Sequence, residues 1–429
     1  MRLNKETLVT GFALFSMFFG AGNLMLPPLL GFKAGNSWGL VLLGFIISAV
    51  IIPLLGILAH AKLQGTMFDL AKKVSPFFST LYCILVYLIS ITLPSPRTAA
   101  VTHEMAIAPF LGTSALLTSV IYFSFVLFFV LNRSKILNLL GKFLSPILFL
   151  VILSIICIGI FSNSEPVLLP TTFQTPIVNG LLEGYQTFDA IGAVVVGAVL
   201  IVSLKINAKQ EFANHKNLII RSGLIAGIGL FIVYSGMIYN GALVGGNFDS
   251  SIGRTELLSA ISLKTLGTIG EKILSILVGL ACFTTAIGIV TGTADYFKSL
   301  CNGSQLAYST TAIIGCILGV VMGQFDVHYI IGVAVPALMF IYPITIVLIL
   351  LNVLPHPFNS NLVFRVVVFV TLLFSFPDFL VTIGLEEPFA TIRESLPLGE
   401  YSLAWLLPAI VSFIISSLIS VSKKRDALV

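Results

Sequence analysis

The sequence predicts an all-α integral membrane protein with twelve transmembrane helices. Three observations carry this prediction: the composition, the apolar windows and the placement of charge. The 429-residue chain is 57% hydrophobic and only 10% charged, whereas a soluble domain carries about 25% charged residues. Its mean hydropathy is +1.06. This composition excludes a soluble globular protein.

Twelve apolar windows are long enough to cross a bilayer, which takes about 20 mostly apolar residues. Charged residues fall in the gaps between the windows, and no linker or low-complexity stretch divides the chain. We therefore expect a single membrane domain over residues 1–429. The windows lie at about 7–32, 37–61, 77–108, 113–132, 141–162, 178–203, 219–243, 271–297, 307–323, 328–351, 363–382 and 402–421.

The basic residues predict the orientation of these helices. Most of the 23 Lys and Arg residues fall in segments that are cytoplasmic if the N-terminus is inside, as positively charged loops prefer. Both termini are then cytoplasmic. The net charge of +5 is explained by this topology and does not indicate a nucleic-acid partner. The five cysteines show no metal-ligand spacing, and we expect no disulfide framework.

The first window cannot form one continuous helix. Residues 20–23 read Gly-Ala-Gly-Asn and are followed by Pro27 and Pro28. Glycine weakens a helix, and proline cannot donate the backbone hydrogen bond that would continue it. Non-helical backbone at membrane depth survives where it is buried in protein or lines a polar cavity. The alternative is that the glycines only allow close helix packing.

An unwound first helix would present backbone groups to a solute. Free amides at a half-helix N-terminus attract a carboxylate, and free carbonyls attract a cation. We expect the amides of Ala21 and Gly22 to take the first role, and the carbonyls of Ser16 and Phe19 to take the second.

The loop lengths indicate an inverted repeat. Two longer gaps, at about 62–76 and 244–270, are separated by five helices and face opposite sides of the membrane. A five-plus-five inverted repeat produces this pattern. We expect the first repeat at about 7–162, the second at about 178–351, and two extra helices at about 363–421. Helix six should then be interrupted as helix one is.

Helix six carries the polar residues expected at such an interruption. Residues 180–192 contain glycines, Gln186 and the two acids Glu183 and Asp189 inside an apolar window. Glycine-interrupted segments in corresponding helices of the two repeats indicate a transport site. An aromatic residue here can equally serve helix packing. Three further candidates lie here. The hydroxyl of Thr187 could join a substrate or ion site, and the rings of Tyr185 and Phe188 could line a pocket.

Helix eight carries hydroxyl groups on one face. Ala281, Thr284 and Thr285 are spaced i, i+3 and i+4 and therefore share that face. Hydroxyl and carbonyl oxygens suit a small alkali cation better than a transition metal. The alternative is that both threonines only hydrogen-bond to their own helix.

Helix three carries ionisable residues inside an apolar window. Arg97 and Glu104 are seven residues apart, two turns along one face. An intramembrane charge costs at least about 2.5–3.5 kcal/mol, so such residues are seldom idle. With Glu183 and Asp189 of helix six they could form a gate or a proton-sensitive network. The alternatives are a structural ion pair, or an Arg97 side chain that reaches water.

Three motifs in order resemble one known family. They are FSMFFGAGNLMLPPLLG at 15–31, PRTAAVTHE at 96–104 and GYQTFDAIG at 184–192. Along essentially its whole length the chain is similar to the bacterial branched-chain amino acid carriers, the cation-coupled "system II" symporters for leucine, isoleucine and valine. The resemblance implies a permease of the cytoplasmic (inner) membrane with twelve helices and the leucine-transporter type of fold.

The resemblance also implies roles for individual residues. In that fold a sodium site uses two carbonyls of broken helix one and an Ala-x-x-Thr-Ser/Thr set on helix eight. Ser16 and Phe19 with Ala281, Thr284 and Thr285 match this pattern. The Gly-x-Gly-Asn turn matches the turn that holds the substrate carboxylate. Asn23 and Thr187 match side chains that hold a first sodium in some members, although helix seven offers no convincing partner for that site.

Together these patterns predict a secondary active transporter that imports leucine, isoleucine and valine with Na⁺ as coupling ion, by alternating access. A proton-coupled permease that titrates Asp189, Glu183 or Glu104 is the alternative. A membrane enzyme would need a nucleophile–base set or metal ligands, and a channel would need repeated pore-lining polar rings. The sequence shows neither. We expect no organic cofactor, no nucleic acid and no obligatory protein partner, only the small-molecule substrate and the lipid bilayer.

Overall fold

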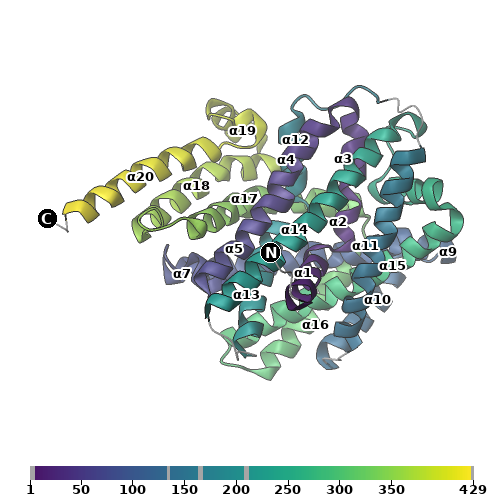
Figure 1. Cartoon of the computed structure of the whole chain (residues 1–429), viewed down its shortest axis with the longest axis horizontal. Coiled ribbons are helices and arrows are strands. Elements are labelled where there is room, and N and C mark those ends of the chain that lie inside the picture. Colours follow the sequence, from purple (N-terminus) through teal and green to yellow (C-terminus); the bar gives the residue numbers. More distant parts are fainter. Residues whose placement is uncertain (1–4, 133–135, 163–167, 207–211, 427–429) are drawn as a thin grey trace. The chain divides into compact units, whose positions relative to one another are not determined.

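The computed structural model describes residues 5–132, 136–162, 168–206 and 212–426, and every regular element in these ranges is a helix (Figure 1). The prediction of an all-α fold is therefore confirmed. The chain separates into two compact units. The first unit contains Met1–Ile47, Tyr87–Thr187 and Ile225–Val333, and the second contains Ser48–Val86, Phe188–Leu224 and Ala334–Val429.

The helices of the first predicted repeat are mostly interrupted. Their bounds are α1 Lys5–Phe18, α2 Ala21–Leu24, α3 Leu26–Ala34, α4 Trp38–Ile46, α5 Ile52–Leu63, α6 Met67–Ala71, α7 Pro76–Thr92, α8 Pro94–Thr102, α9 Ala108–Leu111, α10 Ala115–Asn132 and α11 Ile136–Ser162. A 3₁₀ turn (η1, Gly35–Ser37) and two π-helical turns (η2, Ile47–Ile51, and η3, His103–Ile107) connect some of them.

The later helices are longer. Their bounds are α12 Pro176–Tyr185, α13 Asp189–Ile206, α14 Phe212–Leu243, α15 Arg254–Leu300, α16 Gln305–Gly323, α17 Val327–Val353, α18 Asn361–Thr382, α19 Glu386–Ser395 and α20 Leu406–Asp426, with 3₁₀ turns at Gly245–Asn247 (η4) and Gly399–Tyr401 (η5). In the described part of the chain eight helical segments are long and apolar enough to cross a membrane, and two shorter apolar helices lie at Pro146–Ser162 and Leu406–Ser422. The count of twelve spans stays a prediction.

Helix one is broken where the sequence predicts. α1 ends at Phe18, and Gly20 adopts an extended conformation (φ −78°, ψ 145°) before α2 begins. The amide of Gly20 donates to the carbonyl of Phe18 over 2.8 Å. The break thus begins at the first glycine of the Gly-Ala-Gly-Asn segment. The two prolines lie in the first turn of α3, where backbone N–H groups have no partner within the helix, so the missing N–H of proline costs nothing.

Helix six is broken too, but a glycine does not make the turn. α12 ends at Tyr185 and α13 begins at Asp189. Between them Phe188 has a φ of 59°, in the left-handed region that a bulky side chain rarely adopts. The prediction of an interrupted helix six is confirmed, and the residue that carries the unusual backbone is an aromatic one.

Helices three and eight differ from their predicted bounds. Helix three breaks at Leu93, because Pro94 and Pro96 follow it and α8 starts at the first of them. Helix eight begins at Arg254 instead of near residue 271, so more than half of the predicted external gap is helical. Gly267 bends this long helix with a φ of 69°, a conformation that glycine adopts without steric cost.

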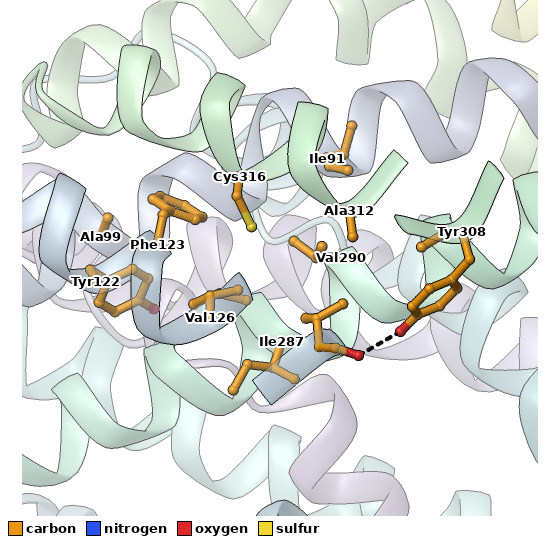
Figure 2. Packing of buried hydrophobic residues seen from close by; sticks show 13 residues of the cluster. Ile91, Ala99, Tyr122, Phe123, Val126, Ile287, Val290, Tyr308, Ala312 and Cys316 are labelled. Carbon is orange, nitrogen blue, oxygen red and sulfur yellow. Dashed lines mark hydrogen bonds between the residues drawn. The ribbon is translucent and has the colours of Figure 1, made fainter. Parts of the chain in front are cut away.

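An apolar cluster holds the helices of the first unit around α15 (Figure 2). Ala286, Ile287, Val290 and Ala294 of α15 pack there against residues of α7, α8, α10 and α16. Because residues 286, 287, 290 and 294 repeat at helical spacing, this packing fixes which face of α15 is turned away from the cluster.

Glycines allow the broken helices of the first unit to pack closely on their neighbours. A Cβ on Gly180 of α12 would lie 2.0 Å from the carbonyl oxygen of Val41 in α4. A Cβ on Gly31 of α3 would lie 1.8 Å from the carbonyl oxygen of Ile238 in α14. No side chain fits at such distances, so these crossings require glycine.

The second unit has its own close packing. α5 packs against α13, and α18 packs against α20. A Cβ on Gly56 would lie 2.9 Å from Cβ of Ala193. The hydroxyls of Tyr82 and Thr345 are 2.9 Å apart, which joins α7 to α17.

Candidate functional site

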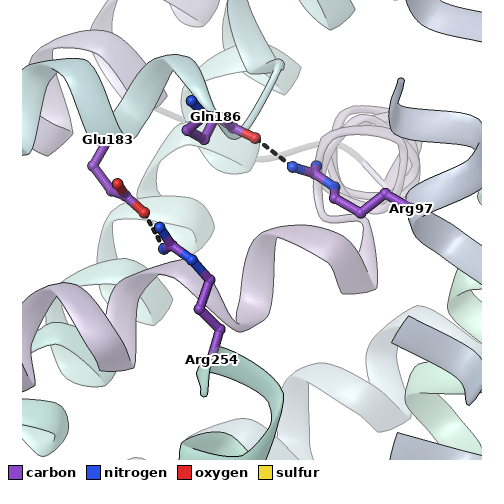
Figure 3. A network of polar contacts seen from close by, with 4 residues as sticks. All are labelled: Arg97, Glu183, Gln186 and Arg254. Carbon is purple, nitrogen blue, oxygen red and sulfur yellow. Dashed lines mark hydrogen bonds and ion pairs between the residues drawn. The ribbon is translucent and has the colours of Figure 1, made fainter. Parts of the chain in front are cut away.

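A buried arginine connects the two broken helices of the first unit, and Figure 3 shows its contact with the break of helix six. The side chain of Arg97, in the first turn of α8, is only 4% exposed. Its Nη1 donates to the main-chain oxygen of Gln186, in the break of helix six, over 2.7 Å. Its Nη2 donates to Oδ1 of Asn23, in the broken part of helix one, over 3.4 Å. The rigid guanidinium fork can reach both partners at once.

Asn23 holds the break of helix one from the other side. Its Nδ2 lies 3.2 Å from the carbonyl oxygen of Phe18, the last residue of α1, and 3.4 Å from the hydroxyl of Tyr234 in α14. The side chain therefore spans the break and ties α2 to α1, to α14 and, through Arg97, to α8. Ser16, Ala21 and Gly22, whose backbone groups the sequence assigns to this site, lie outside the residues whose surroundings the structure describes.

The break of helix six contributes three buried residues to the first unit. Thr187 donates its hydroxyl to the carbonyl of Gly184 over 2.8 Å, and its amide donates to the same oxygen. Tyr185 and Gln186 are buried beside it. Among the described residues, Oε1 of Gln186 accepts no hydrogen bond. The sequence contains this signal, because an amide side chain inside an apolar window needs a partner, but it assigned no role to Gln186.

The acids of helices three and six hold the start of α15. Glu183 of α12 forms an ion pair with Arg254, the first residue of α15 (Figure 3). The two side chains are 19% and 15% exposed. Glu104 in η3 accepts from the hydroxyl of Thr255 over 2.5 Å and from the amide of Val327, the first residue of α17, over 2.8 Å. No described contact joins Arg97, Glu104 and Glu183 to one another, and their role in a gate or proton network stays a prediction.

The hydroxyl face of helix eight meets the break of helix one. α2 and α3 pack against α15, and a Cβ on Gly20 would lie 3.6 Å from Oγ1 of Thr285. Thr284 and Thr285 both donate to the carbonyl of Ala281, over 3.0 and 2.8 Å. The hydroxyls are thus bonded to their own helix, as the alternative reading expects. Each donor hydroxyl keeps lone pairs with which it can ligate a cation. Phe19, whose carbonyl the sequence proposes as a ligand, is buried in the same break.

Phe188 and Asp189 belong to the second unit. Asp189 opens α13 and is 3% exposed. The next amide, that of Ala190, lies 3.3 Å from the hydroxyl of Tyr342 in α17. The predicted roles of Phe188 in a pocket and of Asp189 in a gate or proton network stay predictions.

Comparison with known proteins gives matches along the whole chain. The profile of a family described as "Branched-chain amino acid transport protein" matches residues 3–423. The branched-chain amino acid permease BraB of Bacillus subtilis is 34% identical over 423 residues, which cover 96% of this chain and 94% of the relative. The branched-chain amino acid transport system 2 carrier protein of Pseudomonas aeruginosa is 31% identical over 432 residues, covering 99% and 98%.

Solved structures with a similar fold are transporters of several kinds. The crystal structure of MhsT in complex with L-phenylalanine matches with a TM-score of 0.54 at 16% identity, covering 96% of this chain and 98% of MhsT. An outward-open Na⁺-coupled sialic acid symporter matches with a TM-score of 0.60 at 14% identity, covering 96% and 90%. At these identities the likeness concerns the fold alone, and it confirms the expected leucine-transporter type of fold.

Proposed function

Because the chain belongs to the family of branched-chain amino acid transport proteins, we propose that it imports leucine, isoleucine and valine by sodium symport with alternating access. The chain is a multi-pass membrane protein and a transporter, not an enzyme. The proposal adds the direction of transport, the coupling ion and the residues that bind each solute.

The observation that carries the proposal is the connection between the two breaks. Arg97 hydrogen-bonds to Gln186 in helix six and to Asn23 in helix one, so the two interrupted segments of the first unit lie together. Interrupted helices place the ends of half-helices, and hence their backbone dipoles, around a solute. The substrate carboxylate would meet the amides of Ala21 and Gly22 beside Asn23.

The apolar side chain of the substrate would lie among the residues of helix six, which are Tyr185, Thr187 and Phe188. A pocket of this kind separates ligands that differ by one methylene by only about 1–3 kcal/mol. Overlapping use of leucine, isoleucine and valine follows from that small difference.

The sodium ion would bind where helix one meets α15. Its ligands would be the carbonyls of Ser16, Phe19 and Ala281 and the hydroxyls of Thr284 and Thr285. The short distance of 3.6 Å between a Cβ built on Gly20 and Oγ1 of Thr285 supports this placement. A donor set made only of oxygen atoms suits a hard cation. The bound sodium ion would favour one conformational state of the carrier. The sodium gradient would thereby drive uptake of the amino acid.

A proton-coupled carrier is the second candidate, and the burial of Asp189 at the start of α13 favours it. Glu183 and Glu104 are the other two acids of this alternative. Glu183 has Arg254 as its ion-pair partner, and Glu104 accepts two hydrogen bonds.

The proposal also includes the arrangement in the membrane. The five-plus-five inverted repeat would comprise about 7–162 and 178–351, with about 363–421 as extra helices. The chain would lie in the bacterial cytoplasmic membrane with both termini cytoplasmic, as the distribution of Lys and Arg favours.

Uptake of labelled leucine into proteoliposomes tests the function, with a sodium gradient and a proton gradient imposed separately. We expect accumulation with the sodium gradient alone. Accumulation with the proton gradient alone would replace sodium by protons as the coupling ion. No saturable uptake of leucine, isoleucine or valine under either gradient would reject the proposed substrate class.

A further inference from the structure

We propose that Arg97 and Gln186 together recognise the two charged groups that all α-amino acids share. The guanidinium of Arg97 binds the α-carboxylate, and Oε1 of Gln186 accepts a hydrogen bond from the α-ammonium group. This inference rests on the proposed function and names the residues that select amino acids as a class. It assigns a role to Gln186, which lies in the motif GYQTFDAIG but which neither the motif nor the similarity to relatives gives a role.

The position of Arg97 carries the first step. Its guanidinium lies between the breaks of helices one and six and bonds to both. The bond from Nη1 to the Gln186 carbonyl, at 2.7 Å, is short, whereas that from Nη2 to Asn23, at 3.4 Å, is long and therefore weak. A carboxylate that arrives beside Asn23 can replace this weak contact while the short one holds the guanidinium in place. Guanidinium–carboxylate pairs are among the strongest hydrogen-bonded pairs in proteins.

The side chain of Gln186 carries the second step. It is 4% exposed, and its Oε1 accepts no hydrogen bond from any described residue. Buried acceptors without a donor are rare in folded proteins and call for a specific explanation. A primary ammonium group offers three N–H donors and no acceptor, and it is the partner that such an oxygen fits.

The two steps support each other through one residue. The main-chain oxygen of Gln186 accepts a hydrogen bond from Arg97 (Figure 3). The side chain of the same residue carries Oε1, the acceptor that no described donor satisfies. The carboxylate and ammonium groups of an α-amino acid are attached to one carbon atom, so one ligand at the break of helix six can present both groups. The amides of Ala21 and Gly22, proposed above as carboxylate ligands, would bind the second oxygen of the same carboxylate.

Ligands that lack one charged group test this assignment. We would measure equilibrium binding of labelled leucine to the purified full-length protein in detergent with sodium. The competitors are unlabelled leucine, leucinol, which lacks the carboxylate, and 4-methylpentanoate, which lacks the ammonium group. The variants are Arg97→Lys and Gln186→Leu. Their matched controls are Arg365→Lys, which bonds to the carbonyl of Val74, and Gln324→Leu, which bonds to the carbonyl of Val321.

Each variant should affect only the ligands that carry its partner group. Arg97→Lys should weaken leucine and 4-methylpentanoate about tenfold or more and leave leucinol unchanged. Gln186→Leu should weaken leucine and leucinol by a similar factor and leave 4-methylpentanoate unchanged. Both controls should bind all three ligands like the wild type.

The other outcomes are equally informative. If a variant weakens all three ligands by the same factor, its residue only maintains the structure and the assignment is wrong for that residue. If Arg97→Lys does not fold, the pattern for Gln186→Leu alone decides whether the ammonium group is bound there. If the wild type binds no leucine, the proposed function fails, and that result is distinct from a failure of this inference.

Discussion

The carboxylate of Glu104 accepts a hydrogen bond from the amide of Val327 at 2.8 Å, although 223 residues separate them in the chain. The second oxygen of Glu104 accepts from Thr255. One acid in the π-helical turn of helix three therefore holds the first turn of α15 and the first residue of α17. Such a contact has consequences for stability that can be measured.

Replacing Glu104 should lower thermal stability. Glu104→Ala removes both acceptors and leaves the buried amide of Val327 without a partner, at a cost of about 1–3 kcal/mol. Glu104→Gln keeps one acceptor oxygen and should cost less. The melting midpoint of the purified protein in detergent measures this order. Glu256→Ala is the control, because Glu256 is exposed and its contact with the amide of Gly253 is 3.4 Å long. A Glu104→Ala protein that melts with the wild type would contradict the role assigned to this carboxylate.

The threonines of helix eight should determine sodium affinity. Thr284→Ala or Thr285→Ala removes one ligand oxygen and should raise the sodium concentration for half-maximal leucine uptake about tenfold or more. Thr285→Ser keeps the oxygen and should have a mild effect. Thr371→Ala is the matched control, since Thr371 bonds to its own helix in the same way but lies in α18. If both alanine variants keep the wild-type sodium dependence, the site lies elsewhere.

The crossing of α4 and α12 should not tolerate a methyl group. In Gly180→Ala the new Cβ would overlap the backbone of Val41, which cannot move aside as a flexible side chain can. Overpacking of this kind costs about 1–3 kcal/mol or more. We expect a lower melting midpoint and less folded protein in the membrane. Gly39→Ala has nothing within 4 Å of its new Cβ and should behave like the wild type. If the two variants are equally stable, α4 and α12 do not need glycine at position 180 to pack together.

Asp189 should distinguish sodium coupling from proton coupling. With sodium as the coupling ion, Asp189→Asn changes affinity at most, and uptake keeps its dependence on the sodium gradient. With protons, a carboxylate must alternate between its charged and neutral forms during transport. Asp189→Asn should then abolish accumulation and preserve the exchange of internal for external leucine. Both activities can be measured in the same vesicles, with Asp326→Asn, an exposed acid that precedes α17, as control. Lost accumulation with preserved exchange, and no response to sodium, would overturn the choice of sodium.

The breaks in the helices were predictable where local chemistry causes them. Two glycines spaced by one residue interrupt helix one, and the repeat implied by the two long gaps led to the interruption of helix six. The residue that makes the second turn, Phe188, was not predictable as such. Its left-handed φ is unfavourable for an aromatic residue on its own, so the surrounding structure must impose it.

The polar contacts of the site were less predictable because they join distant segments. Arg97 and Glu104 were expected on one face of helix three, yet their described partners are residues 74 to 223 positions away. The sequence showed that these charges needed partners but carried no information on which ones. The helical start of α15 at Arg254 was missed because its polar first turn resembles a loop, although Glu256 stands three residues after Gly253, where it can bond to the first amides of a helix.

The π-helical turn η3 affects how this helix can change length during evolution. Such a turn closes its hydrogen bonds one residue later than an α-helix does. Deleting one residue between His103 and Ile107 would therefore restore ordinary α-helical spacing and leave the helix continuous. Because the wide turn absorbs the extra residue, the side chains of α9 that follow it would keep their orientation. Alignments of relatives should accordingly place single-residue gaps inside this helix as well as in the loops.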